Sequence, residues 1–147
     1  MSRDQLPRRL EVCGERPPRP SRRTVIDSTI PGPNIAVLVP CLDEAATIGE
    51  VVAEFRSALP GCTVYVYDNG STDDTALRAA EAGAVVRSEM VPGKGAVVRR
   101  MFADVDADVY VMADGDGTYD AAQAGQLVKH LREDDLDMVV GVRTGVT

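Results

Sequence analysis

The sequence predicts an α/β fold in which a mostly parallel sheet is covered by helices on both faces. Short runs rich in Val, Ile and Tyr alternate with segments whose apolar residues recur at helical spacing. The runs at 35–39 and 109–113 are apolar at every position, as expected for strands buried on both faces of a parallel sheet. Polar residues follow several of these runs, at the edge where ligands of parallel sheets bind.

Composition divides the chain into a tail and one domain. Residues 1–33 hold six of the nine prolines and seven arginines and show little apolar periodicity, so we predict a disordered tail there. Residues 34–147 are long enough to form a single folded domain. That part carries 9 basic and 19 acidic side chains, which argues against a nucleic acid partner, because phosphate contacts need Lys and Arg.

The first unit of the domain is a strand followed by a helix. Its strand is predicted at 35–39 and ends at Pro40. Thr47 can cap the helix that follows, with Glu50 three residues later as the partner of a capping box. Apolar residues then recur at helical spacing as far as Leu59, before a Pro-Gly pair.

The same alternation continues to the end of the chain. Further strands are predicted at 63–67, 84–87, 109–113 and 138–142. Further helices are predicted at 75–82, 96–103 and 121–132. No apolar run approaches the roughly 20 residues of a membrane span, and the three cysteines form no C-x-x-C pair. These features predict no transmembrane segment in this chain and a reducing, cytoplasmic location.

The strand at 109–113 ends in a pattern typical of a metal site. Asp114 and Asp116 are two residues apart, so both carboxylates can face one hard cation such as Mg²⁺ or Mn²⁺. Gly115 and Gly117 leave room for a ligand to approach the backbone. An Asp-Gly turn with no metal is the alternative, because these residues are common in turns.

Two more side chains are candidates for ligand binding. Asp68 directly follows a predicted strand and can offer its carboxylate to a donor group, or can form an Asx turn. Lys94 lies between two glycines ahead of a predicted helix, where an ammonium and backbone N–H groups can meet a phosphate. A lysine in a surface loop is the alternative for Lys94.

Four segments together resemble a known family. They are V-L-V-P-C-L-D-E-A-A-T-I at 37–48, Y-D-N-G-S-T-D-D-T at 67–75, G-K-G-A at 93–96 and M-A-D-G-D-G-T-Y-D at 112–120. In order and spacing they resemble the family 2 glycosyltransferases, and most of all the branch with dolichyl-phosphate mannose and glucose synthases. The resemblance implies a Rossmann-like GT-A fold, which binds nucleotide-diphospho-sugars, over about residues 34–143.

The resemblance also implies roles for individual residues. Those expected to bind the donor are Pro40, Glu44, Asp68, Lys94, Asp114, Gly115 and Asp116. Pro40 and Glu44 match a proline and a glutamate that line the nucleoside pocket in the family, and Asp68 matches an acid that contacts the base. Lys94 matches a lysine near the diphosphate, and Asp114 and Asp116 match the D-x-D pair that binds the metal. Asp43 stands where the family usually has asparagine, and Asn69 where it often has a second aspartate.

The implied activity is inverting, metal-dependent transfer of a sugar from a UDP- or GDP-sugar, with Mg²⁺ or Mn²⁺ as cofactor. A polyprenyl phosphate is the acceptor that the branch implies, in cell-envelope glycan synthesis at the cytoplasmic membrane face. Family members continue for roughly as much again beyond their donor-binding half. We therefore expect this chain to be an incomplete, donor-binding half, in which we identify no catalytic residue. A partner chain is one possible source of the acceptor half.

Two other functions remain open at this stage. A sugar-phosphate nucleotidyltransferase would need a loop rich in glycine and arginine after the first strand, and this chain has P-C-L-D-E-A-A there. A non-catalytic nucleotide-sugar-binding or interaction domain, as a truncated paralogue or a subunit, is the other alternative.

Overall fold

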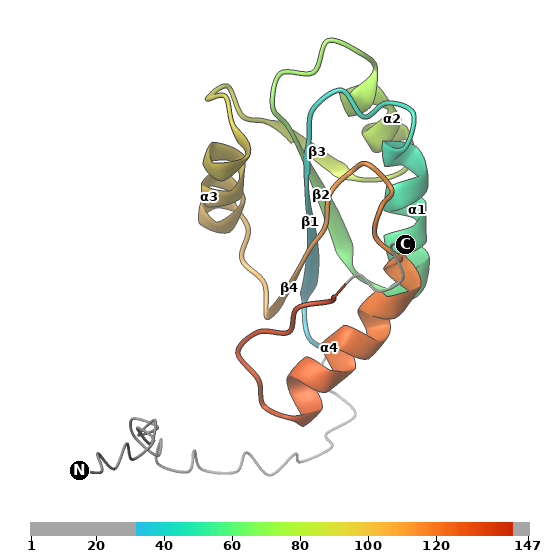
Figure 1. Cartoon of the computed structure of the whole chain (residues 1–147), viewed down its shortest axis with the longest axis vertical. Coiled ribbons are helices and arrows are strands. Elements are labelled where there is room, and N and C mark those ends of the chain that lie inside the picture. Colours follow the sequence, from blue (N-terminus) through green and yellow to red (C-terminus); the bar gives the residue numbers. More distant parts are fainter. Residues whose placement is uncertain (1–31, 143–147) are drawn as a thin grey trace, which may run out of the picture. The chain divides into compact units, whose positions relative to one another are not determined.

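The computed structural model describes residues 32–142, which form alternating strands and helices (Figure 1). The strands are β1 (Ile35–Cys41), β2 (Thr63–Asp68), β3 (Val85–Ser88) and β4 (Val109–Met112). The helices are α1 (Ile48–Ala58), α2 (Thr75–Glu81), α3 (Lys94–Asp104) and α4 (Ala124–Glu133), with a 3-10 turn, η1 (Ala121–Gln123), before α4. Residues 1–31 of the predicted tail lie outside the described residues.

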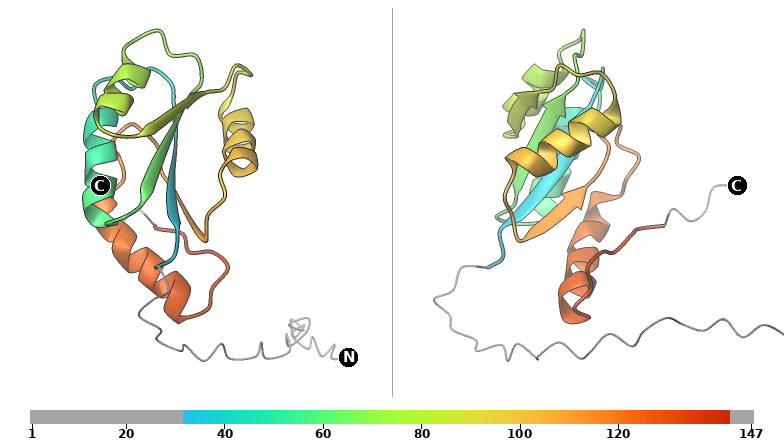
Figure 2. Two further views of the ribbon diagram at one scale, coloured as in Figure 1. Left: turned by 180° about the vertical axis from the view of Figure 1, so that it is seen from behind. Right: turned by 90° about the vertical axis from the view of Figure 1, so that its left-hand side faces the viewer.

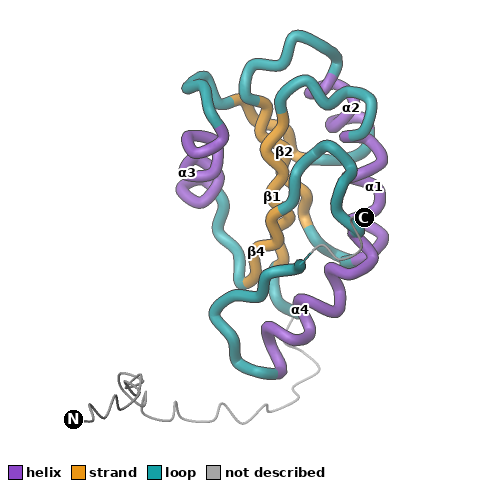
Figure 3. Tube along the Cα trace, viewed as in Figure 1, coloured by secondary structure: helices purple, strands orange, loops and turns teal. Residues whose placement is uncertain are grey.

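The four strands form one parallel sheet in the order β3-β2-β1-β4 (Figure 3). Strand β1 is central and pairs with β2 on one side and with β4 on the other. Alternate residues of β1 enter two separate cores: Val37 and Val39 pack in one, and Ala36 and Leu38 in the other. The sheet is therefore buried on both faces, as the apolar runs predict.

Helices cover both faces of the sheet (Figure 2). Of the described helices, only α3 lies over one face, where Val97 and Met101 pack against β1 and β2. Helices α1, α2 and α4 lie on the other face, and α1 contributes Val52 and Phe55 to the larger core. No helix in the described part of the chain has the length and apolarity to cross a membrane.

The strand predicted at 138–142 is wrong. This segment is irregular, and Met138, Val140 and Val142 are 76%, 69% and 81% exposed. A β-prone run becomes a strand only when a neighbouring strand takes up its backbone hydrogen bonds and another layer covers its side chains. Residues 138–142 pair with no strand among the described residues, so their preference for an extended conformation does not produce a strand.

Pro40 does not end the first strand, contrary to the prediction. β1 continues to Cys41, and Pro40 stays in register with Tyr67 of β2. Leu38 is the last residue of β1 that pairs with β4, and its carbonyl accepts a hydrogen bond from Ala113 N. Pro40 lies two residues later and so faces β4 as well, but it has no N–H to donate. β1 and β4 therefore separate at this end of the sheet.

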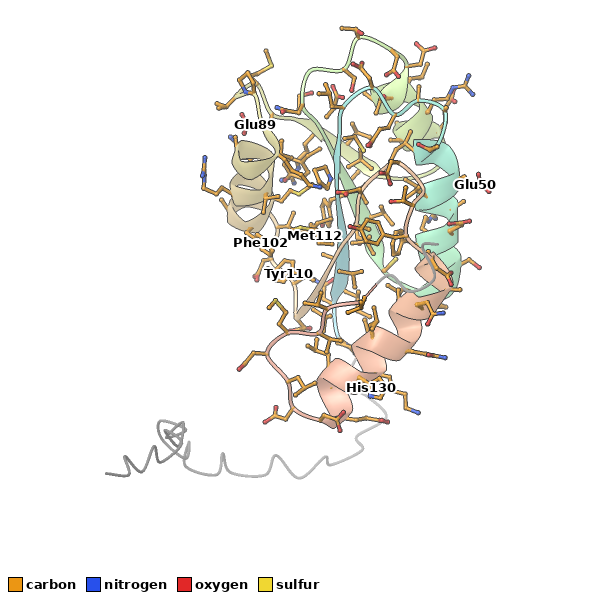
Figure 4. All side chains as sticks on the ribbon, in the orientation of Figure 1. Glu50, Glu89, Phe102, Tyr110, Met112 and His130 are labelled. Carbon is orange, nitrogen blue, oxygen red and sulfur yellow. The ribbon has the colours of Figure 1, made fainter. Side chains whose placement is uncertain are left out.

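The predicted capping box is also absent. Thr47 is the N-cap of α1, but its side chain makes no capping hydrogen bond. Its hydroxyl instead donates to the carbonyl of Gly115 at 2.7 Å, a residue 68 positions later. Glu50 is exposed and projects outward from α1 (Figure 4). Thr47 therefore connects the start of α1 to the loop after β4.

A polar cluster fixes the last turn of α3 to the sheet. The hydroxyl of Tyr67, on the buried strand β2, donates to Asp104 Oδ2 at 3.2 Å and accepts from an Arg87 nitrogen at 3.2 Å. Asp104 Oδ2 also accepts from Arg100 Nε at 2.7 Å. The cluster lies at the end of α3 opposite to Lys94.

This cluster predicts a pH dependence of stability. The hydrogen bond from Arg100, together with the charges of Arg100 and Arg87, lowers the pKa of Asp104. The stabilisation is therefore complete above the unfolded pKa of about 3.9 and is lost as pH falls through the lower folded pKa. We expect Asp104→Asn to lower the urea midpoint at neutral pH, with the difference from wild type shrinking towards about pH 3. The exposed Asp106, replaced by Asn, is the control; a difference independent of pH would contradict the prediction.

Candidate functional site

A pocket of about 300 Å³ opens at the carboxyl ends of β1, β2 and β4. Side chains from several elements line it: Pro40, Cys41, Leu42, Glu44, Asn69, Pro92, Gly93, Lys94, Val97, Asp114 and Asp116. The separation of β4 from β1 after Leu38 places the pocket between their ends. Five of the seven predicted donor-binding residues belong to its lining, namely Pro40, Glu44, Lys94, Asp114 and Asp116.

Lys94 and Asp114 form an ion pair in the pocket. Lys94 Nζ contacts Asp114 Oδ1, although the two residues come from the start of α3 and the end of β4. The hydrogen bond to Asp114 is the main reason that the pKa of Lys94 is raised. Lys94, the only cation among the described residues of the lining, thus contacts one of the two carboxylates predicted to bind metal.

Asp116 combines a turn with a place in the lining. Its Oδ1 accepts hydrogen bonds from the Thr118 N–H at 3.0 Å and from the Thr118 hydroxyl at 2.7 Å. The turn that the sequence offered as an alternative to a metal site is therefore present. It is compatible with metal binding, because a carboxylate has about four lone-pair sites.

Gly115 lies where no side chain fits. A Cβ at this position would overlap Glu44 Oε2 and would come within 2.6 Å of Cys41 Sγ. Glu44 Oε2 is buried and has no hydrogen-bond partner among the described residues. Burial is the main cause that raises the pKa of Glu44, and the charges of Asp116 and Asp114 add to it.

Cys41 is a packing residue rather than a nucleophile. The side chain is 3% exposed, and burial is the largest of the effects that raise the pKa of its thiol far above the ordinary range. A thiol must ionise to attack a substrate. Cys41 thus forms part of the apolar wall of the pocket.

Asp68 lies outside the lining of the pocket. It is 9% exposed, and its Oδ1 accepts a hydrogen bond from Ser71 N, three residues later, at 3.3 Å. Its proposed contact with a base remains a prediction.

The loops after β1 and β2 are joined by hydrogen bonds between side chains and backbone. Asp43 has a positive φ of 54°, and its Oδ1 accepts from Thr72 N at 2.7 Å. Thr75, which is fully buried, accepts from Glu44 N at 2.8 Å, and Asp73 accepts from Ala45 N at 3.1 Å. Asparagine also tolerates a positive φ and can accept the same bond, so Asp43 can stand where the resemblance leads us to expect asparagine.

Asn69 is absent from the predicted donor-binding residues, yet it lines the pocket and holds the segment before α3. Its position directly after Asp68 at the end of β2 was the available signal. The apolar residues Leu42, Pro92 and Val97 also went unpredicted, because only the three-dimensional structure brings them to one wall.

The donor set of the pocket suits a cation that shares its ligands with a substrate. No group of three or more His, Cys, Asp or Glu residues that could hold a metal occurs within residues 32–142. Mg²⁺ and similar hard ions are commonly held by one or two carboxylates, with water and substrate phosphate completing the shell. Asp114 and Asp116 fit this arrangement, and Glu44, whose Oε2 has no hydrogen-bond partner among the described residues, lines the same pocket.

Residues 36–147 match the model of the glycosyl transferase family 2. The curated relatives include protein RfbJ of Shigella flexneri, which is 54% identical over 110 residues that cover 75% of this chain and 85% of RfbJ. Glycosyltransferase AglJ of Haloferax volcanii is 39% identical over 110 residues, which cover 74% of this chain and 36% of AglJ.

Solved structures of similar fold include glucosyl-3-phosphoglycerate synthase from Mycobacterium tuberculosis. One superposes with a TM-score of 0.61 and 34% identity, covering 68% of this chain and 41% of the synthase. The complex of the synthase with Mn²⁺, UDP and glucosyl-3-phosphoglycerate matches with a TM-score of 0.61 and 33% identity. This chain thus spans less than half of AglJ and of the synthase, but most of RfbJ.

Proposed function

Because the chain belongs to glycosyl transferase family 2, we propose that its pocket binds the nucleotide-sugar donor of a metal-dependent glycosyl transfer. The predicted fold class is confirmed: the parallel sheet with helices on both faces is the GT-A sandwich shared with the synthase. The observation that carries the proposal is the convergence of Asp114, Asp116 and Lys94 on one pocket with an apolar wall.

Six of the lining residues form three groups by chemistry. Asp114 and Asp116 would hold Mn²⁺ or Mg²⁺, which neutralises charge on a departing diphosphate. Lys94 supplies a second positive charge at the N-terminus of α3, where backbone N–H groups also favour phosphate. Pro40, Leu42 and Val97 offer apolar surface to a nucleoside.

The donor is proposed to be a UDP-sugar. The related synthase has been solved with Mn²⁺, UDP-glucose and phosphoglyceric acid, and also with Mg²⁺ and UDP. These complexes support a UDP-sugar over the GDP-sugar that the sequence left open. The family matches do not favour the non-catalytic alternative.

The acceptor and the location remain parts of the proposal. A polyprenyl phosphate at the cytoplasmic membrane face would suit the chain's own residues, because its oxygen is already anionic near neutral pH and needs no strong general base. The acceptor-binding residues would come from the part of the relatives that this chain does not span, or from a partner chain.

Calorimetric titration of the full chain tests the proposal. UDP, GDP, UDP-glucose and GDP-mannose would each be added with Mn²⁺ and then with EDTA. We expect binding of UDP and UDP-glucose that EDTA removes. If circular dichroism shows a folded chain that binds none of the four with Mn²⁺, the donor-site proposal is wrong.

Lys94→Met is expected to change metal and nucleotide affinity in opposite directions. Without nucleotide, Mn²⁺ should bind about 1.4- to fivefold more tightly, because an exposed ion pair of about 0.2–1 kcal/mol no longer competes for Asp114. UDP should bind more weakly, since a cation near the diphosphate is lost. Calorimetry measures both constants. Lys129→Met, which removes an ion pair with Glu133 on α4, is the matched control and should leave both unchanged.

A further inference from the structure

We propose that Asn69 is a positioning residue, which sets Lys94 against the donor diphosphate by holding the segment 89–93 in front of α3. The inference rests on the proposed function, and it concerns a side chain to which neither the sequence motifs nor the comparisons give a role. In this proposal, one amide side chain determines the position of the end of α3 that carries Lys94.

The Asn69 side chain makes three hydrogen bonds with this segment. Its Nδ2 donates to the carbonyls of Glu89 and Val91, both at 2.8 Å, and its Oδ1 accepts from Gly93 N at 2.8 Å. The two N–H donors of the amide are thus both used. We call these three side-chain bonds the Asn69 clamp. The backbone N–H of Asn69 donates to Cys41 O at 2.9 Å, so the clamp is itself fixed to the end of β1.

The segment 89–93 depends on this clamp for its position. Met90 and Val91 are 85% and 58% exposed, so burial contributes little to holding them. Pro92 has no N–H, and Val91 N bonds only locally, to Glu89 Oε1 at 2.7 Å. Glu89 N also bonds to Asp68 O at 2.9 Å, which fixes the start of the segment beside β2.

Gly93 transmits the constraint to Lys94. It is the N-cap of α3 with a φ of 109°, and its carbonyl accepts from Ala96 N and Val97 N in the first turn. Holding Gly93 N on Asn69 Oδ1 therefore fixes where the helix begins. Figure 4 shows Glu89 beside the end of α3 where the helix starts. Lys94 is the first helical residue, so its reach into the pocket follows from this attachment.

Only an amide makes these bonds. An aspartate at position 69 has the same shape but no donor, and it would place a carboxylate oxygen against two carbonyl oxygens. Asn69→Asp is therefore a nearly isosteric change that reverses the interaction with the segment.

The test compares UDP affinity in the presence of Mn²⁺ for the full-length chain and its variants, by calorimetry. We expect Asn69→Asp to weaken UDP binding at least about tenfold, which corresponds to about 1.4 kcal/mol. Asn34→Asp is the matched control: it makes the same chemical change at the far end of β1, where Asn34 Nδ2 donates to Asp106 O, and it should change UDP affinity less than about twofold.

A double-mutant cycle separates positioning from general destabilisation. In the Lys94→Met background, Asn69→Asp should cost less than about twofold, because the group that it positions is already gone. Equal losses in both backgrounds, or unchanged UDP affinity in Asn69→Asp, would overturn the role of Asn69 and leave the donor site standing. A folded wild-type chain that binds no UDP would overturn the proposed function and this inference with it.

A second variant covers the case in which Asn69→Asp does not fold. Asn69→Ala deletes the three hydrogen bonds without adding a charge, and the same loss and the same coupling to Lys94 are expected of it. Circular dichroism decides which variant enters the cycle.

Discussion

Asp114→Asn is expected to abolish Mn²⁺-dependent binding of UDP. Asp114 lines the pocket beside Asp116 and carries the charge that now holds Lys94. Loss of a residue that merely supports a metal ligand typically costs 10- to 100-fold in affinity, so loss of a carboxylate ligand should cost at least about 100-fold. Calorimetry with Mn²⁺ and UDP measures the effect, and circular dichroism checks that the variant folds.

A nearby carboxylate gives the matched control. Asp120→Asn removes the same charge four residues after Asp116, but asparagine can still accept the capping bond from Ala122 N, now 3.0 Å long. Its UDP affinity should stay within about twofold of wild type.

Asp116→Asn should behave as Asp114→Asn does, because an amide oxygen preserves the turn with Thr118 but not the charge. Metal-dependent binding that survives in Asp114→Asn would place the cation elsewhere.

The second large effect is expected of Gly115→Ala. The new Cβ would overlap the Glu44 carboxylate and the Cys41 thiol, both of which are packed against the wall of the pocket. Overpacking of this kind costs about 1–3 kcal/mol. Displacement of Glu44 and of the loop that carries Asp114 and Asp116 should also weaken UDP binding. Urea denaturation and calorimetry measure the two effects.

Gly49→Ala is the control for this change. Gly49 lies in the first turn of α1, and a Cβ there meets only Arg78 O at 3.9 Å, an ordinary contact. Alanine in a helix is favoured over glycine by up to about 1 kcal/mol, so this variant should be slightly more stable than wild type. A Gly115→Ala variant as stable as wild type would mean that Glu44 moves aside without strain.

Most of the fold could be predicted from the sequence, because its signals are local. The runs at 35–39 and 109–113 are apolar enough to specify buried strands, and helical spacing identified α1 through α4. The failures came where a distant partner decides the outcome. Thr47 bonds to Gly115 instead of closing a capping box, and residues 138–142 lack a neighbouring strand among the described residues.

The candidate site shows the same division. Asp114 and Asp116 could be found because both follow one strand at a spacing with chemical meaning. The pairing of Lys94 with Asp114 could not, since it joins two elements across the pocket. The sequence places Asn69 at the end of a strand, but its three hydrogen bonds to a segment about 20 residues later could not be predicted from any local pattern.

The place of β4 at the border of the sheet has a consequence for local opening. Among the residues that the structure describes, β4 pairs with β1 alone, over Val109–Met112, and Asp114 follows within two residues. Strands held on one side open at lower free energy than central strands, and their amides exchange with solvent sooner. A ligand that bridges Asp114 to the loop after β1 would raise the free energy of this local opening of β4. Occupancy of the pocket should therefore be readable as slowed hydrogen exchange along β4, far beyond the atoms that the ligand touches.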